Sequence, residues 1–191
     1  MITMPVELYT DGSSLRNPGE SGLGYIIQYW ENPENDDAMP VSKRIEGSQG
    51  FRRSTNNRME IMAAIYGIRA ILENQNGPLQ GITQINLYSD SDYLVKAVTQ
   101  RWVEKWMRSN WMTSGFGGSK PKAVKNRDLW EELLKLQDQL KASSINLTVT
   151  HVTGHAGNEL NELADRLAVK ASNDAVHHII DEAYENSSGK H

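Results

Sequence analysis

The order in which strand and helix patterns follow one another constrains the fold of this chain most strongly. Residues 6–10, 24–30 and 41–47 read as three consecutive strands, and such a succession favours an antiparallel meander. Over residues 55–74 the apolar period changes to that of a helix that is apolar on most of its circumference. The change of period predicts an α/β protein in which this helix is largely buried.

The rest of the chain continues the alternation. The further elements are a strand over residues 84–89, helical patterns over 92–109, a helix over 127–141, a strand over 145–152 and a last amphipathic helix. The predicted order is therefore three strands, a helix, a strand, two helices, a strand and a helix. With 191 residues and no internal repeat, the chain has the size of one domain.

Composition excludes several classes of protein. No apolar run is long enough to cross a membrane, and the first strand pattern begins too early to leave room for a secretory signal. Together with the absence of cysteine, this favours a cytoplasmic protein. The formal net charge is −4, so attraction to a nucleic acid would require a local basic patch and bound cations.

Four carboxylates stand where strands and helices can present them to one point. Asp11 follows Leu-Tyr-Thr and Asp90 follows Leu-Tyr-Ser, so two strands end alike, and their carboxylates meet if the strands are neighbours. Glu60 and Asp165 lie on predicted helices. Each acid also has an ordinary explanation, as a turn residue, as part of a capping box between Asn57 and Glu60, or as a member of a solvated helix face.

Six segments of the sequence form a series that covers most of the chain. They are YTDGSSLRNPG at 9–19, STNNRMEIMAA at 54–64, YSDSDYLV at 88–95, RWVEKWMRSNW at 101–111, KNRDLW at 125–130 and VTGHAGNELNELADRLA at 152–168. In this order and with this spacing, they resemble type 1 ribonuclease H of the bacterial kind, over residues 6–171.

The resemblance implies a five-stranded mixed sheet flanked by helices, and a site in which two divalent cations are held. The implied metal ligands are Asp11, Glu60, Asp90 and Asp165. It also implies an endoribonuclease that hydrolyses the RNA strand of RNA–DNA hybrids and leaves 5′-phosphate and 3′-hydroxyl ends. His155, in the sequence Gly-His-Ala-Gly, matches the family's mobile histidine, which assists proton transfer or product release. The resemblance favours a monomer with no obligatory protein partner.

Elementary electrostatics explains why such a cluster would hold cations. Two carboxylates ~4 Å apart repel by about 4 kcal/mol at an effective dielectric constant of about 20, so four together are unstable without counter-charge. Ligands that are all oxygen suit Mg²⁺ or Mn²⁺. A pair of such ions can activate a water on one side of the scissile phosphate and stabilise the leaving oxygen on the other.

Discrimination of RNA from DNA requires contacts to the 2′-hydroxyl, for which asparagine amides offer both a donor and an acceptor. The resemblance places Asn17, Asn56 and Asn57 in the minor groove of the hybrid, and Arg53 and Thr55 in a phosphate pocket. Asp92 departs from the glutamine that bacterial relatives often carry there. An aspartate can accept a hydrogen bond from a 2′-hydroxyl but cannot donate one.

Residues 102–125 resemble the family's substrate-handling protrusion. Its implied binding residues are Trp102, Trp106, Lys120, Lys122 and Lys125. The tryptophan spacing has an alternative explanation as helix packing in the core. Met107 and Ser109 stand where a basic run is common in relatives, so weaker or more salt-sensitive binding of the hybrid is a hypothesis.

The resemblance defines a catalytic domain over residues 1–171 and leaves 172–191 as a C-terminal extension. Within the extension, residues 175–184 favour a short helix and residues 185–191 a polar, disordered tail. Two other functions stay open. One is a protein of the same fold that binds hybrid or structured RNA without cutting it, and the other is a ribonuclease-H-like nuclease that acts on DNA. The asparagines and the Gly-His-Ala-Gly loop argue against the second.

Overall fold

A five-stranded mixed sheet forms the centre of the computed structural model, which describes residues 5–31, 39–113, 120–154 and 157–188. The strands are β1 (Val6–Ser14), β2 (Gly19–Glu31), β3 (Val41–Ser54), β4 (Gln84–Ser89) and β5 (Asn146–His151), in the spatial order β3-β2-β1-β4-β5. The first three strands are antiparallel, whereas β4 and β5 run parallel to β1. The predicted meander and mixed sheet are therefore confirmed, although β2 and β3 are longer than their apolar patterns.

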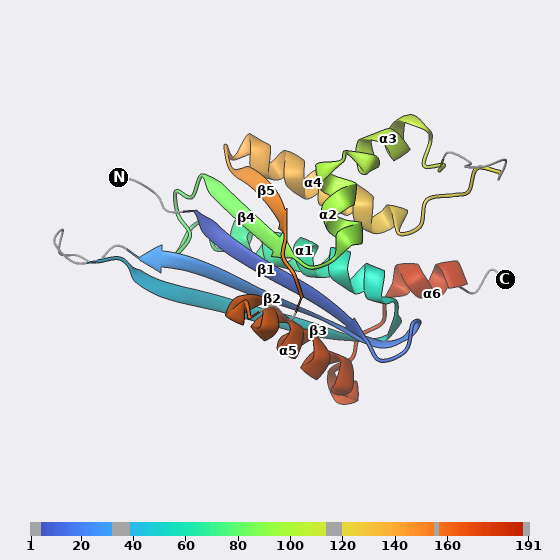
Figure 1. Cartoon of the computed structure of the whole chain (residues 1–191), viewed down its shortest axis with the longest axis horizontal. Helices are drawn as coiled ribbons and strands as arrows, with labels where there is room; N and C mark the ends of the chain where they lie inside the picture. The colour runs from blue at the N-terminus through green and yellow to red at the C-terminus, as the bar shows by residue number, and fades with distance from the viewer. Residues whose placement is uncertain (1–4, 32–38, 114–119, 155–156, 189–191) are drawn as a thin grey trace.

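Helices cover both faces of the sheet (Figure 1). They are α1 (Asn56–Glu73), α2 (Asp92–Thr99), α3 (Trp102–Arg108), α4 (Arg127–Ala142), α5 (Glu159–Asn173), the 3₁₀ turn η1 (Ala175–His177) and α6 (Glu182–Ser188). α1 packs against β1 and β2 on one face, and α4 packs on α1. α5 covers β1, β2 and β3 on the other face. Within the described ranges, no helix combines the length and the hydropathy that crossing a membrane requires.

The two faces of β1 belong to different apolar clusters, because successive side chains of a strand point to opposite sides. Leu8 is fully buried in the main cluster, where α1 contributes Ile61 and Ile65. Tyr9 packs instead with Leu160 of α5. β1 is thus buried on both faces at the centre of the sheet, and this location fixes the position of Asp11, two residues after Tyr9.

The C-terminal extension differs from its predicted structure. No helix spans residues 175–184, and residues 185–188, predicted as part of a disordered tail, lie in α6 instead. Between η1 and α6 the chain is extended beside β3, where Ile179 N–H donates to Gly50 O at 3.0 Å and Arg52 N–H donates to Ile179 O at 2.9 Å. The prediction was wrong because these tertiary hydrogen bonds outweigh the weak local helix pattern.

Candidate active site

Asp11 and Asp90 reach the same level of the sheet because their strands are parallel neighbours. The register pairs Leu8 with Leu87 and Tyr9 with Tyr88, and each aspartate comes two residues after its tyrosine. β1 does not end at Asp11 as predicted, because its pairing with β2 continues to Ser14 while its pairing with β4 stops at Tyr9. Asp11 therefore lies where β1 has lost one neighbour, and this leaves room beside it for other side chains.

Glu60 of α1 completes a compact group of three carboxylates. One oxygen each of Asp11, Glu60 and Asp90 lies within 4.8 Å of the others. Asp165 of α5 is half-buried and lines the same cleft, together with Asn56, Asn57 and Ser91. The structure thus brings the four predicted acids to one cleft, three of them tightly and the fourth from the opposite face of the sheet.

The close approach of α1 to β1 depends on Gly12, whose role the sequence reasoning missed. A Cβ atom on Gly12 would lie 2.6 Å from the backbone nitrogen of Glu60 and 2.7 Å from the carbonyl carbon of Met59. The backbone N–H of Gly12 donates to Oδ1 of Asp11 at 2.7 Å. The missing side chain therefore allows α1 to hold Glu60 beside Asp11. An Asp-Gly pair after an apolar strand is the signal that could have suggested it.

Gly154 makes a second close approach, this time to Asp90. A Cβ atom on Gly154 would lie 2.7 Å from Oδ2 of Asp90, so the loop after β5 touches the carboxylate through a glycine. This loop also carries His155, which lies outside the described residues.

Burial and mutual repulsion dominate the electrostatics of the acids. Burial, followed by the charges of Asp90 and Asp165, raises the pKa of Asp11 to about 7, although the Gly12 N–H opposes the shift. Burial and the charges of Asp11 and Asp90 raise the pKa of Glu60 well above its usual range. The protein thus holds carboxylates where they resist ionisation unless a positive charge joins them.

The donor set fits a hard divalent cation. Oε2 of Glu60 is buried and has no hydrogen-bond partner among the described residues, whereas Oε1 accepts from Nδ2 of Asn56 at 3.3 Å. A buried oxygen without a partner is rare in proteins, and a cation would satisfy it. Ligands that are all oxygen are suited to such an ion.

The start of α1 connects the predicted hybrid-reading residues to this cleft. Oδ1 of Asn17 accepts from the backbone N–H of Asn56 at 3.1 Å, and Asn56 in turn bonds Glu60. Asn57 is exposed and lines the cleft. Thr55 is the N-cap of α1, where its hydroxyl accepts from Arg58 N–H at 3.4 Å, so the alternative capping box between Asn57 and Glu60 is wrong.

Asp92 also lines the cleft, and two side chains approach its carboxylate. Lys96 Nζ lies 2.7 Å from Oδ2 of Asp92, and His151 Nε2 lies 3.7 Å from Oδ1. The hydrogen bond from Lys96 is the main reason that the pKa of Asp92 is lowered. The departure from glutamine therefore places an ionised acceptor at the margin of the cleft.

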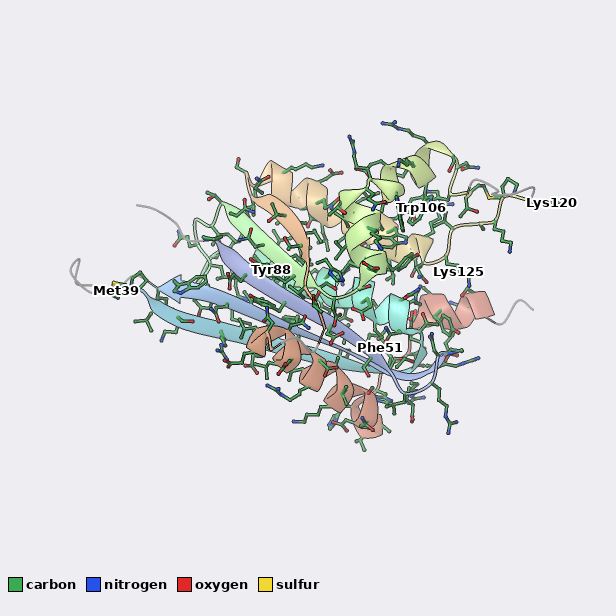
Figure 2. The ribbon with its side chains drawn as sticks, viewed as in Figure 1. Met39, Phe51, Tyr88, Trp106, Lys120 and Lys125 are labelled. Atoms are coloured by element: carbon green, nitrogen blue, oxygen red, sulfur yellow. The ribbon has the colours of Figure 1, made fainter. Side chains whose placement is uncertain are left out.

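The predicted protrusion residues lie apart from the acids. Trp102 and Trp106 of α3 are half-buried, with ring centroids 6.0 Å apart, and Trp106 packs 5.8 Å from Trp130. They therefore pack against the core, as the alternative explanation held, and they also line a groove with Lys105 and Met112. The lysines at 120, 122 and 125 are exposed on the segment before α4, and Figure 2 shows Lys120 at the right-hand end of this segment and Lys125 nearer to α4.

A mixed sheet with carboxylates gathered beyond the paired ends of two parallel strands defines a class of protein, the α/β fold of ribonuclease H with an acidic cleft suited to divalent metal ions. The family model described as RNase H matches residues 3–173. The chain belongs to the RNase H family.

Similar proteins cover nearly the whole chain. Ribonuclease H of Rippkaea orientalis is 40% identical over 181 residues, which are 95% of this chain and 93% of that protein. Ribonuclease HI of a Synechocystis species is 40% identical over 166 residues, 87% of this chain and 86% of that protein. Among solved structures, LC9-RNase H1, a type 1 RNase H with the type 2 active-site motif, matches with a TM-score of 0.67 and 27% identity, over 100% of this chain and 83% of that one. RNase H1 of Halobacterium salinarum matches with a TM-score of 0.58 and 25% identity, over 90% of this chain and 100% of that one.

Proposed function

We propose that this chain is a ribonuclease H that hydrolyses the RNA strand of RNA–DNA hybrids and leaves 5′-phosphate and 3′-hydroxyl ends. The gathering of Asp11, Glu60 and Asp90 within 4.8 Å, with a buried Glu60 oxygen that lacks a partner, is the observation that carries the proposal. The family membership and the ribonuclease H names of the relatives support it. The activity is assigned to the domain over residues 1–171.

The metal ligands in this proposal are Asp11, Glu60, Asp90 and Asp165, and the metal is Mg²⁺, with Mn²⁺ as a substitute. Two ions held by these carboxylates would supply an activated water and stabilisation of the leaving oxygen. The protein's own groups prepare this chemistry. The Gly12 N–H orients the Asp11 carboxylate, and the Asn56 amide holds Glu60 through Oε1 and leaves Oε2 without a hydrogen-bond partner in the described part of the chain.

Recognition of the hybrid is assigned to groups around the start of α1. Asn17, Asn56 and Asn57 read the minor groove, because amides can both donate to and accept from a 2′-hydroxyl. Arg53 and Thr55 bind a backbone phosphate. The remaining contacts are proposed for Trp102, Trp106, Lys120, Lys122 and Lys125, with His155 assisting proton transfer or product release.

A cleavage assay with three substrates tests the proposal. Labelled RNA–DNA hybrid, double-stranded RNA and double-stranded DNA are incubated with Mg²⁺, with Mn²⁺ or with chelator. We expect cleavage of the RNA strand of the hybrid alone, only when a metal is present. Binding of the hybrid without cleavage would favour a non-cleaving binding protein, and cleavage of double-stranded DNA would favour a nuclease of another kind.

A further inference from the structure

The chain segment that follows α5 returns to the start of the catalytic helix α1. The family model ends at residue 173, so η1, the extended residues beside β3 and α6 lie beyond it. In Figure 1 the red helix α6 lies near the end of α1 that carries its first residues. The segment therefore lies beyond the family model, but it contacts Ser54 and Arg58, which lie within it.

Asp181 anchors the segment in the interior. Its side chain is 2% exposed and accepts from Arg58 Nε at 2.7 Å, from Arg58 Nη2 at 2.9 Å and from Ser54 Oγ at 2.6 Å. Its Oδ1 also accepts from the backbone N–H of Tyr184 at 3.3 Å. A buried carboxylate with this many charge-assisted hydrogen bonds is held rigidly, so the first turn of α6 is fixed relative to β3 and α1.

This anchor places Tyr184 against two guanidinium groups. The guanidinium carbon of Arg53 lies 5.9 Å from the centroid of the Tyr184 ring, and that of buried Arg58 lies 6.0 Å from it. Both distances are within the range in which a cation is attracted to an aromatic ring. Tyr184 itself is half-buried, so its ring forms a fixed surface beside Arg53.

Arg53 is exposed near the end of β3, directly before the residues that enter the cleft. Thr55 caps α1 two residues later, and Asn56 then contacts Glu60. Across the described residues, no carboxylate lies within ion-pair distance of Arg53, whereas Arg58 is paired with both Asp181 and Asp128. An exposed guanidinium that rests on a ring keeps its planar N–H donors available for an anion, and a phosphate fits their geometry.

We propose that Tyr184, in the segment beyond the family model, is a positioning residue that holds the Arg53 guanidinium for contact with a backbone phosphate of the hybrid. The inference rests on the proposed function, because Arg53 contacts phosphate only if the hybrid binds across the start of α1. The C-terminal segment then takes part in substrate binding through Arg53 without touching the scissile bond.

A double-mutant cycle on the full chain tests the inference. Kd for the hybrid is measured in chelator, and KM and kcat are measured in Mg²⁺, for wild type, Tyr184→Leu, Arg53→Ala and the double variant. Losing the ring contact is expected to raise Kd and KM about two- to fivefold while kcat stays constant. Tyr184→Phe keeps the ring, so its Kd and KM should stay nearer to those of wild type than to those of Tyr184→Leu. In the Arg53→Ala background, Tyr184→Leu should add no further loss.

Additive losses in the double variant would overturn the inference, since they would show that Tyr184 acts without Arg53. A Tyr184→Phe variant as weak as Tyr184→Leu would also contradict it. Lys141→Ala removes a positive charge at the C-terminal end of α4 and is the control for a general loss of charge. A wild-type protein that neither binds nor cuts hybrid would refute the proposed function. Normal cleavage by the wild type, with Kd and KM unchanged in Tyr184→Leu, would refute the inference alone.

A measurement on the wild type covers the case in which Tyr184→Leu fails to fold. The NMR resonance of the Arg53 Nε–H group should be shifted by the ring of Tyr184 in the free protein, and it should move again when hybrid is added in chelator. An Arg53 resonance that is unaffected by the hybrid would contradict the inference.

Discussion

Asn56 donates from Nδ2 to Oε1 of Glu60 at 3.3 Å, across one turn of α1. This hydrogen bond favours the ionised form of Glu60 and therefore opposes the rise in its pKa that burial causes. We expect Asn56→Ala to weaken Mg²⁺ binding by about 10-fold or more, the loss typical of removing a partner of a metal ligand. Titration calorimetry of the metal with the free protein measures it. Asn57→Ala, which leaves the Glu60 contact intact, is the matched control and should bind Mg²⁺ normally.

Replacement of the central carboxylates should separate cleavage from binding. Asp11→Asn and Asp90→Asn remove a charged metal ligand each but preserve the shape of the side chain. We expect kcat to fall more than about 100-fold, which exceeds the loss typical of outer partners of metal ligands. Binding of hybrid in chelator should stay within a few-fold of wild type. Near-normal turnover by either variant would show that the assigned ligands are wrong.

Stability of the metal-free protein should fall as the pH rises. The pKa of Asp11 is about 7 in the folded protein and 3.8 in the reference state, so the folded state binds more protons in this interval. The free energy of unfolding in chelator should therefore decrease between pH of about 4 and about 7. Denaturant titrations at several pH values measure this slope. Asp11→Asn should flatten it, because the ionisable group is gone while an oxygen remains for Gly12 N–H.

Gly12→Ala should be destabilising and should impair the site. Its Cβ atom would lie 2.6 Å from the backbone nitrogen of Glu60, and only a movement of α1 away from β1 relieves this contact. We expect a loss of about 1–3 kcal/mol in the free energy of unfolding, together with weaker metal binding. Gly77→Ala is the control, because its Cβ would meet its nearest neighbour at 3.7 Å. Equal free energies of unfolding for the two variants would contradict the close approach of α1 to β1 at Gly12.

Asp181→Ala should be among the most destabilising single substitutions. It would leave the buried guanidinium of Arg58 with Asp128 alone, and removing one partner of a buried pair costs up to about 3–5 kcal/mol. Chemical denaturation measures the loss. Asp138→Ala, which breaks the exposed pair with Lys141, should cost less than about 1 kcal/mol. A small effect at Asp181 would mean that the segment beyond α5 is loosely attached.

The sequence predicted those features of the protein that depend on residues close together in the chain. The sequences that lead to Asp11 and Asp90 are alike, and this likeness predicted that the two aspartates lie side by side on neighbouring strands. The structure pairs these strands, β1 and β4, in parallel. The apolar pattern of residues 55–74 corresponds to α1, which begins at Asn56. Such features depend on neighbouring residues, so periodicity contains them.

Other features depend on partners far along the chain. The close approach of β1 and α1 at Gly12 depends on packing against Met59 and Glu60, so the pattern of residues around Gly12 does not predict it. Arg58 and Asp181 are 123 residues apart, and neither is unusual in its own segment. The helix predicted over residues 175–184 failed for the same reason, since hydrogen bonds of Ile179 with β3 hold part of that range extended.

Because Arg58 and Asp181 are 123 residues apart, the ribosome synthesises Arg58 long before Asp181. A chain made from its amino end exposes β1, α1 and α4 to one another well before Asp181 leaves the ribosome, and domains begin to fold as they emerge. Arg58 can meet Asp128 early, but its second carboxylate arrives only with the segment after α5. Every buried residue of the main apolar cluster precedes α5, so that cluster is synthesised before the carboxylate that completes the ion pairs of α1.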